Sequence, residues 1–217
     1  MSGLAAGVDD AGRGSIIGPL VIAGVLYPEA NMDDLTAIGV KDSKKLTPLR
    51  RRKLAEEIKK MVKGYHVVEI PPAKVDEAVA RGRKFRKLNF LEARAMAEVI
   101  GKLKPEVAYV DSCDIDVKRF SSHIAEFLKV PVRLVCEHEA EEKYPVVAAA
   151  SIIAKVHRDQ AVAKLREQYG DFGSGYPSDP RTLKFLEKWV REHGEYPWFV
   201  RKTWKTLRRL QPFQLKL

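Results

Sequence analysis

The sequence predicts an α/β protein: a mixed sheet flanked by helices, followed by a small helical subdomain. Two observations carry this prediction. Short apolar, β-rich runs come first and then alternate with helical patterns, as in sheets covered by helices. After a turn-rich loop at residues 173–180, only amphipathic helical patterns remain. The chain has 217 residues, enough for a buried core, and we expect the α/β domain over 1–170 and the helical subdomain over 171–217.

The N-terminal strands are predicted from apolar runs separated by turn residues. Residues 4–8 form the first run, which leads through Asp9 and Asp10 into a turn at Gly12-Arg13-Gly14. Residues 16–26 resume a β-rich pattern, so we expect a hairpin. Residues 65–70 alternate enough for a third strand, and two later short runs, 107–110 and 132–135, for two more.

The helices are predicted from apolar spacing and end signals. Thr47-Pro48 is typical of a helix start, with Thr as the N-cap and Pro at the first position, and this helix should stop by Gly64. Pro145 likewise opens a long alanine-rich helix. That helix is expected over 146–165, and the remaining predicted helical stretches are 74–79, 89–100, 117–128, 183–190 and 199–210.

Composition narrows the class of protein without fixing it. The formal net charge is +10, from 39 Lys and Arg against 29 Asp and Glu, which favours polyanionic partners but also suits mere solubility. No apolar run is long enough to span a bilayer, and the first ten residues lack a signal-peptide pattern, so we expect a cytoplasmic protein. Cys113 and Cys136 fit no zinc pattern, so we expect reduced thiols, or one bridge in a hyperthermophilic host.

Acidic residues follow predicted strands or precede a helix at three places. Asp9 and Asp10 end the first strand, Asp111 ends a later one, and Glu141 precedes the long helix, flanked by Glu139 and Glu142. Strand ends are where α/β sheets build sites. Clustered carboxylates repel one another unless a cation neutralises them, and such oxygen donors suit Mg²⁺ or Mn²⁺. Asp111 alone, or the Glu139–Glu142 cluster alone, would be interpreted as solvated residues. Taken together with the motifs described next, the acids indicate a site where two metals could hold the attacking water and the leaving oxygen of a phosphodiester.

A series of motifs then identifies a family resemblance. The motifs, in chain order, are Gly7-Val8-Asp9-Asp10-Ala11-Gly12-Arg13-Gly14 with Gly18-Pro19, Asp42-Ser43-Lys44-Lys45-Leu46, Leu88-Asn89, Val110-Asp111, residues 143–155 (Lys-Tyr-Pro-Val-Val-Ala-Ala-Ala-Ser-Ile-Ile-Ala-Lys), His157-Arg158-Asp159 and Gly173-Ser174-Gly175-Tyr176. The set spans nearly the whole chain and resembles ribonuclease HII, the type 2 ribonuclease H family, and its archaeal members most.

The resemblance implies a ribonuclease H-like fold and an activity. It implies endonucleolytic hydrolysis on the 5′ side of ribonucleotides, in RNA/DNA hybrids and in ribonucleotide-containing duplex DNA, leaving 3′-hydroxyl and 5′-phosphate ends. By the same resemblance, Asp9, Asp10, Asp111 and Glu141 hold the metals and catalyse the reaction. Gly12, Arg13 and Gly14 sense the ribose 2′-hydroxyl largely through backbone groups. Tyr176 packs against the sugar at the RNA–DNA junction, and the remaining substrate-binding positions are Lys44, Lys45, Asn89, Lys155 and Arg158.

The chain departs from the family pattern at two carboxylates. Asp10 stands where the family has Glu, and Glu141 where it has Asp, each moving the oxygens by about 1.5 Å. We expect activity with a preference for Mn²⁺; Glu139 and Glu142 are the alternatives for the fourth ligand. A competing hypothesis is a hybrid-binding protein weakened in catalysis by these swaps. An integrase-like relative is a further alternative, disfavoured by the Gly-Arg-Gly turn and Tyr176.

The C-terminal part interleaves basic residues with tryptophans. Arg201, Lys202 and Lys205 are interpreted either as a solvated face or as a clamp on the duplex backbone, and we expect their loss to flatten the salt dependence of binding. Trp189, Trp198 and Trp204 are expected to be core anchors. Residues 211–217 lack the paired aromatics of a sliding-clamp motif, so clamp binding is left open; by the family resemblance we expect a monomer.

Overall fold

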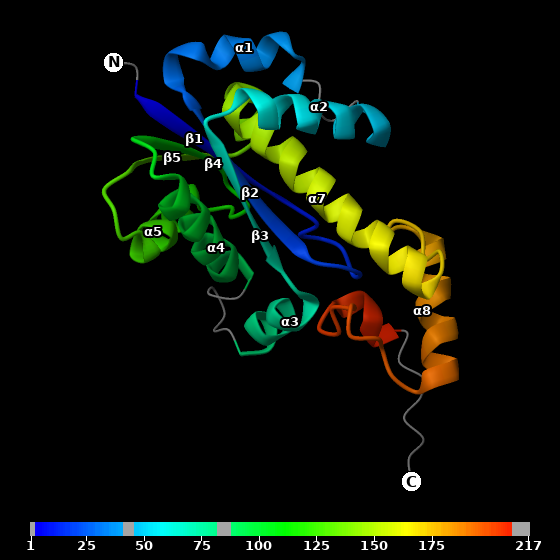
Figure 1. Ribbon diagram of the computed structural model, residues 1–217. Coiled ribbons are helices and arrows are strands. Elements are labelled where there is room, and N and C mark those ends of the chain that lie inside the picture. The colour runs from blue at the N-terminus through cyan, green and yellow to red at the C-terminus, as the bar shows by residue number, and fades with distance from the viewer. Residues whose placement is uncertain (1–2, 41–45, 82–87, 210–217) are drawn as a thin grey trace.

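A five-stranded mixed sheet forms the centre of the protein (Figure 1). The computed structural model describes residues 3–40, 46–81 and 88–209. The strands are β1 (Leu4–Ala11), β2 (Leu20–Pro28), β3 (Gly64–Ile70), β4 (Val107–Asp111) and β5 (Arg133–Glu137). Their order is β3-β2-β1-β4-β5. The pairs β1–β2 and β2–β3 are antiparallel, whereas β1–β4 and β4–β5 are parallel. The predicted mixed α/β sheet is therefore confirmed.

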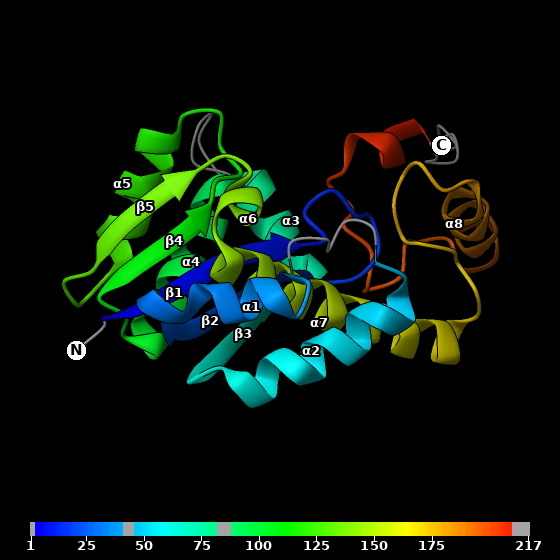
Figure 2. The same ribbon diagram turned by 90° about the horizontal axis from the view of Figure 1, so that it is seen from above.

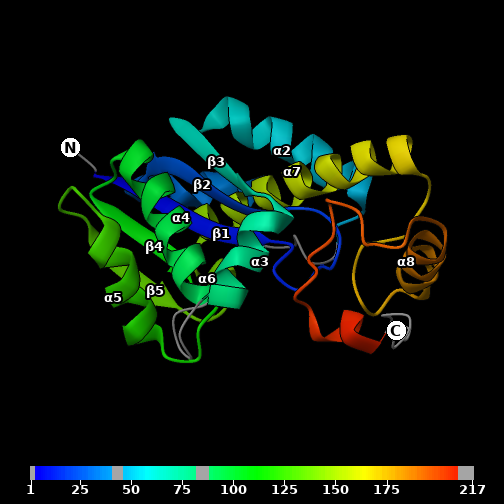
Figure 3. The same cartoon turned by 90° about the horizontal axis from the view of Figure 1, so that it is seen from below.

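Helices cover both faces of this sheet (Figures 1 and 3). One face carries α1 (Met32–Ala37), α2 (Pro48–Met61) and the long α7 (Pro145–Tyr169). The other carries α3 (Pro72–Arg81), α4 (Leu88–Leu103) and α5 (Val117–Phe127). The remaining elements are η1 (Glu29–Asn31), α6 (Ala140–Lys143), α8 (Pro180–His193) and η3 (Lys205–Arg209). In the described part of the chain, no helix combines the length and apolar character needed to cross a membrane.

Alternating side chains along the strands explain the two layers. In β2, Val21, Ala23 and Val25 pack towards α7, whereas Leu20 and Ile22 join the core on the α4 side. At Gly7, helix α7 lies directly on β1, because a Cβ there would lie only 2.2 Å from the backbone of Val146. The start of α7 is thereby held over the strand that carries Asp9 and Asp10.

The start of α2 agrees with the prediction, and the hairpin differs in one detail. The Thr47 hydroxyl accepts a hydrogen bond from the Arg50 N–H at 3.3 Å, and Pro48 opens the helix. β1 and β2 do form an antiparallel pair, but β2 begins at Leu20 rather than at Ile16. The reason is that the N–H groups of Ile16 and Ile17 both donate to the carbonyl of Gly175, outside the sheet. The short helices η1 and α1 were not predicted.

The predicted helix over 199–210 is wrong. Val200 forms an isolated β-bridge with Ile17, and the Arg201 N–H donates to the Ile16 carbonyl at 2.9 Å. The carboxylate of Asp76 on α3 accepts the next two N–H groups, from Lys202 and Thr203. Because distant partners bind these backbone groups, no helical ladder forms before η3, and Leu210 lies outside the described residues.

The C-terminal part has its own apolar cluster beyond the end of the sheet where β1 finishes (Figure 2). Phe172, Leu186 and Phe199 pack there with Ile16 and Ile17 from the loop between β1 and β2. Helix α8 begins at the capping side chain of Asp179, which accepts from the Arg181 N–H at 3.0 Å, and ends at Gly194 in the left-handed region. The apolar cluster of the C-terminal part therefore includes residues from the start of the chain.

The tryptophans do not all anchor this cluster as predicted. Trp204 packs against it, and the ring of Trp189 contacts those of Tyr169 and Phe199. Trp198 is 64% exposed, with its indole N–H donating to the Tyr169 hydroxyl, so the core-anchor prediction is wrong for that residue.

Candidate active site

The predicted acids gather at one edge of the sheet. Val8 of β1 is paired in parallel with Val110 of β4, so the next residues, Asp9 and Asp111, lie side by side. A carboxylate oxygen of Asp111 accepts the N–H of Ala140 at 2.8 Å, which ties the start of α6 to the end of β4. Glu141, the next residue of α6, is brought to the same edge by that bond.

Asp9 is buried and its acidity is strongly altered. Asp9 is only 5% exposed, and burial raises the pKa of its carboxyl to about 7. The Ser151 hydroxyl on α7 opposes this rise in pKa, and the charge of Asp111 adds to it. The Asp10 N–H, which donates to Asp9 at 2.7 Å, and Lys155 both lower the pKa. Lys155, predicted near the site, therefore lies within electrostatic range of Asp9.

Asp10 belongs to a second acidic pair on the other side of β1. Burial raises the pKa of Asp10 well above its usual value, and the charges of Glu92 and Asp9 raise it further, against the effect of Arg13. Glu92, on α4, is fully buried. The site thus contains one more carboxylate than the sequence analysis identified.

These acids fit a divalent cation by their chemistry. Burial and mutual repulsion raise the pKa values of Asp9 and Asp10, and a bound cation would relieve both costs. Carboxylate oxygens are donors that suit Mg²⁺ and Mn²⁺. Among the residues that the structure describes, no three His, Cys, Asp or Glu side chains are already drawn together as a metal site. Besides burial, the neighbouring acids therefore raise the pKa values of Asp9 and Asp10, but the described acids do not already form a closed set of ligands.

The glycine turn lies immediately after these acids. Gly12 has φ +83°, where a Cβ would lie 2.9 Å from the Pro19 carbonyl, so only glycine fits without strain. The Arg13 side chain points inward to α4: its Nε donates to Glu92 at 2.9 Å and its Nη2 to Asn89 at 2.7 Å. Gly14 is exposed with open space around it. The turn consequently exposes its backbone at Gly14, while the partly buried Arg13 side chain is held against α4.

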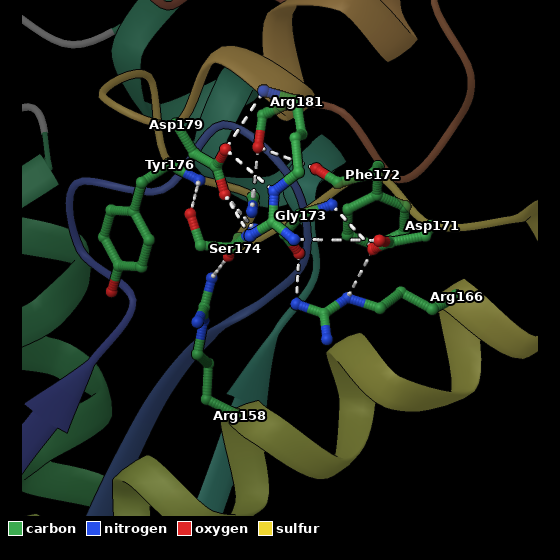
Figure 4. A network of polar contacts seen from close by, with 11 residues as sticks. Arg158, Arg166, Asp171, Phe172, Gly173, Ser174, Tyr176, Asp179 and Arg181 are labelled. Atoms are coloured by element: carbon green, nitrogen blue, oxygen red, sulfur yellow. Dashed lines mark hydrogen bonds and ion pairs between the residues drawn. The ribbon is translucent and has the colours of Figure 1, made fainter.

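Arg158 joins this turn to the loop that carries Tyr176 (Figure 4). The buried guanidinium donates to the Ser174 carbonyl at 2.8 Å and lies 4.6 Å from the centre of the Tyr176 ring. A Cβ on Gly12 would lie 3.2 Å from Arg158 Cγ, and one on Gly175 3.4 Å from its Nη2. Arg158 therefore packs between the two glycine-containing segments.

A compact polar network fixes the Tyr176 loop, and Figure 4 shows it from close by. The Asp179 carboxylate accepts the Ser174 N–H at 2.8 Å and a guanidinium N–H of Arg181 at 3.0 Å. The pKa of Asp179 is lowered by these bonds, chiefly the one from Arg181. Arg166 of α7 donates to the Gly173 carbonyl. The loop, and Tyr176 with it, is thus anchored to α7 and to the start of α8.

Arg201 differs from its sequence interpretation. Arg201 is 0% exposed, so it belongs neither to a solvated face nor to a clamp on the duplex, the two predictions made for it. Its guanidinium donates to the carbonyls of Arg13 at 2.9 Å and Gly18 at 3.2 Å and lies over the Trp204 ring. Burial, together with Arg158, lowers its pKa to about 10, so it remains charged at neutral pH. Strong internal acceptors explain why a cation can be buried there.

Most predicted site residues come together in one region. The acids, Lys155, the Gly12–Gly14 turn, Asn89, Arg158 and Tyr176 are linked through the contacts above. Glu139 and Glu142, the alternative ligands, are both exposed. Lys44 and Lys45 lie outside the described residues.

Glu92, Ser151 and Arg201 were not assigned to the site from sequence. For Glu92 a signal existed: it stands three residues after Asn89, one helical turn along α4, so both face Arg13. Both cysteines are free, as expected. The Cys113 thiol donates to Glu92 at 3.0 Å, and burial and Glu92 raise its pKa, which keeps it protonated.

Comparison with known proteins identifies the family. The family model described as Ribonuclease HII matches residues 6–207. Ribonuclease HII of Pyrococcus abyssi is 48% identical over 95% of this chain and 90% of its own. The crystal structure of ribonuclease H2 from Pyrococcus horikoshii is 46% identical, with a TM-score of 0.88 over 96% of this chain and 97% of that one.

Two further structures bear on the fold and on partners. Ribonuclease HII of Archaeoglobus fulgidus, solved in a complex with PCNA, is 47% identical, with a TM-score of 0.86 over 97% of this chain and 98% of that one. Ribonuclease HIII from Bst, solved with Mn²⁺, is 22% identical, with a TM-score of 0.81 over 96% of this chain and 69% of that one. At 22% identity, the similarity to ribonuclease HIII shows a shared fold and nothing further.

Fold and site together define a type 2 ribonuclease H: a hydrolase and an endoribonuclease that acts on RNA/DNA hybrids. Within that class, the chain belongs to the ribonuclease HII family.

Proposed function

We propose that this enzyme hydrolyses the phosphodiester on the 5′ side of a ribonucleotide, leaving 3′-hydroxyl and 5′-phosphate ends. Its substrates are RNA/DNA hybrids and duplex DNA with a single embedded ribonucleotide. The observation that carries the proposal is the position of the glycine turn, which directly follows the acids at the end of β1. A group that senses a 2′-hydroxyl is useful only next to the groups that cut beside it.

The chain's own residues would bind and orient the sugar. The open backbone at Gly14 allows close approach to the ribose, and the Arg13 side chain leaves it accessible because it is held against Glu92. Tyr176 offers an aromatic face for the sugar on the other side, and its position is fixed by Arg158 beneath the ring. We propose Lys155, and Lys44 and Lys45 outside the described residues, as contacts for phosphate groups.

Asp9, Asp10, Asp111 and Glu141 would hold two Mg²⁺ or Mn²⁺ ions. When bound, such ions activate the attacking water and stabilise the leaving oxygen. The burial of Asp9 keeps bulk water from competing for its oxygens, and the Asp111 bond to Ala140 keeps Glu141 beside it. The Ser151 hydroxyl and Lys155 favour the charged form of Asp9 that ligation requires.

The test is a panel of end-labelled duplexes incubated with Mg²⁺ or Mn²⁺. The panel contains all-DNA, an RNA/DNA hybrid, and DNA with one ribonucleotide. We expect no cut in all-DNA, cuts throughout the hybrid, and one nick 5′ to the single ribonucleotide, with ends mapped by ligation and by phosphatase treatment. A nick on the 3′ side, or binding without any nick, would overturn the proposal; the second result would favour a hybrid-binding protein.

The carboxylate swaps lead to a metal-dependence prediction. Wild-type protein should cleave faster with Mn²⁺ than with Mg²⁺, because Asp10 and Glu141 displace ligand oxygens and the larger ion tolerates this better. The double variant Asp10→Glu with Glu141→Asp should raise the Mg²⁺ rate by roughly 10- to 100-fold, the scale of a 1 Å misplacement. Single-turnover rates in each metal provide the measurement. Equal or higher wild-type rates with Mg²⁺ would disprove the preference.

Exposed C-terminal lysines lead to a salt-dependence prediction, now without the buried Arg201. Lys202→Ala with Lys205→Ala should reduce the slope of log Kd against log salt for duplex binding by up to about 2, since each phosphate contact contributes about 0.9. The matched control is Lys102→Ala with Lys129→Ala, two exposed lysines near α4 and α5. Equal slopes in both pairs would make Lys202 and Lys205 an ordinary solvated face.

We also propose that the chain acts as a monomer and that residues 171–217 form a subdomain that supports the site. Gly170, which ends α7 at φ +91°, supports the boundary. Sliding-clamp binding is not part of the proposal, because residues 211–217 lie outside the described residues.

A further inference from the structure

The segment from Pro197 to Arg209 is tied to the loop that follows β1 (Figures 2 and 3). Gly18 N–H donates to the Phe199 carbonyl and Arg201 N–H to the Ile16 carbonyl, both at 2.9 Å. Between these backbone bonds, Val200 bridges to Ile17. The two segments are far apart in sequence, so the loop takes its position partly from the end of the chain.

The Arg201 side chain adds a second connection, directed at the glycine turn itself. Its guanidinium donates to the Arg13 carbonyl and, through two nitrogens, to the Gly18 carbonyl at 3.3 and 3.2 Å. These two carbonyls bracket residues 13–18. A planar guanidinium fixes the direction of its donors, so it sets the separation and tilt of the two carbonyls.

Within the turn itself, local support is weaker. The Ser15 N–H and hydroxyl both donate to the Gly12 carbonyl, at 3.2 and 2.9 Å, and no atom lies within 4 Å of a Cβ built on Gly14. Arg13 is instead held from both sides: Glu92 binds its side chain and Arg201 its carbonyl. Two buried charged residues on distant elements therefore fix the peptide that faces the proposed ribose site.

Asp76 on α3 anchors the segment at its outer edge. Its carboxylate accepts the N–H of Lys202 at 2.8 Å, and the N–H and hydroxyl of Thr203 at 2.9 and 2.6 Å. This half-buried residue contacts neither the acids nor the turn in the bonds described. It stabilises the backbone on which Arg201 sits.

We infer that Arg201 is a positioning residue for ribose recognition: it holds the Gly12–Gly14 turn in the conformation that distinguishes a ribonucleotide, and Asp76 holds Arg201 in place. This inference rests on the proposed function. Arg201 does not touch substrate; its effect passes through the Arg13 carbonyl. The segment from Pro197 to Arg209 thereby contributes to the recognition of a ribonucleotide, although it supplies no catalytic group.

The test measures discrimination rather than activity alone. Dissociation constants are measured with Ca²⁺ for a duplex with one ribonucleotide and for the same sequence in all-DNA, and their ratio is compared among variants. Arg201→Lys keeps the positive charge but loses the several donors of the planar guanidinium. It should reduce the ratio of the two dissociation constants by about 10-fold. Asp76→Ala should reduce it by about 3-fold. Single-turnover rates and KM follow for each variant, together with thermal unfolding.

Glu77→Ala is the matched control, since Glu77 neighbours Asp76 on α3 but pairs only with Lys74 and Arg81 in the described contacts. It should leave the ratio unchanged. A general loss of fold weakens binding to both duplexes alike and does not change their ratio, so an unchanged ratio in Asp76→Ala and in folded Arg201→Lys would overturn the inference. If Arg201→Lys does not fold, Asp76→Ala alone decides. A wild-type ratio near one would instead refute the proposed ribose recognition.

Discussion

Replacing Asp9 with Asn should abolish cleavage while leaving duplex binding intact. The amide keeps the shape of the carboxylate but loses its charge, so it cannot hold a divalent cation beside Asp111. We expect the single-turnover rate on a single-ribonucleotide duplex to fall by about 100-fold or more, the scale reached when catalytic groups are misplaced by about 1 Å. Binding of the same duplex, measured by anisotropy, should change little, because basic residues elsewhere supply most of it.

Asp33→Asn is the matched control for that experiment. Asp33 lies exposed on α1, away from the end of β1, and the substitution has the same chemistry. Its rate should equal that of wild type. An Asp9→Asn protein that cleaves at more than a tenth of the wild-type rate would show that this carboxylate is not part of the metal site.

Replacing Gly7 with Ala should destabilise the whole fold. A Cβ at Gly7 would lie 2.2 Å from the Val146 backbone, closer than any real contact, so the start of α7 must move away from β1. Overpacking of this kind, against backbone that cannot change rotamer, should lower the free energy of unfolding by about 3 kcal/mol or more. Chemical denaturation monitored by circular dichroism measures the loss. Activity should fall as well, because α7 carries Ser151, Lys155 and Arg158.

Gly101→Ala in α4 serves as the control of opposite sign. No atom lies within 4 Å of a Cβ built there, and alanine favours a helix over glycine by up to about 1 kcal/mol. That variant should be as stable as wild type or slightly more stable. If Gly7→Ala were as stable as Gly101→Ala, the close packing of α7 on β1 would be disproved.

Local sequence signals predicted much of the fold. The apolar runs gave all five strands, and the end signals gave the starts of α2 and α7, because capping and proline effects act over a few residues. The strand ends also gave the acidic edge, since side chains that end neighbouring parallel strands must meet. The motif series gave the partners around it, including Asn89, Arg158 and Tyr176.

Long-range bonds account for what the sequence did not predict. The spacing of residues 199–210 predicts a helix, but Ile16, Ile17 and Asp76 bind its backbone groups, and none of them is near in sequence. The same holds for Arg201: a basic residue in an amphipathic pattern is usually solvated, and only the carbonyls of Arg13 and Gly18 make its burial favourable. Partners of this kind become visible only once the fold brings them together.

The most direct test of the account is the pH dependence of stability with and without metal, in wild type and Asp9→Asn. Burial raises the Asp9 pKa from 3.8 to about 7, so the folded protein binds that proton more tightly than the unfolded chain. The stability that this carboxyl contributes is complete below about pH 4 and is lost as pH rises through 7. It amounts to on the order of 4 kcal/mol for a shift of about three units.

The free energy of unfolding is measured from pH 5 to 8 in EDTA and in Mn²⁺. In EDTA, wild type should lose stability relative to Asp9→Asn as pH rises, and Mn²⁺ should restore it at pH 8 in wild type only. That result would establish that the acids at the end of β1 are a cluster destabilised by its own charge and stabilised by a divalent cation. Parallel pH profiles for the two proteins, with no effect of Mn²⁺, would contradict the account.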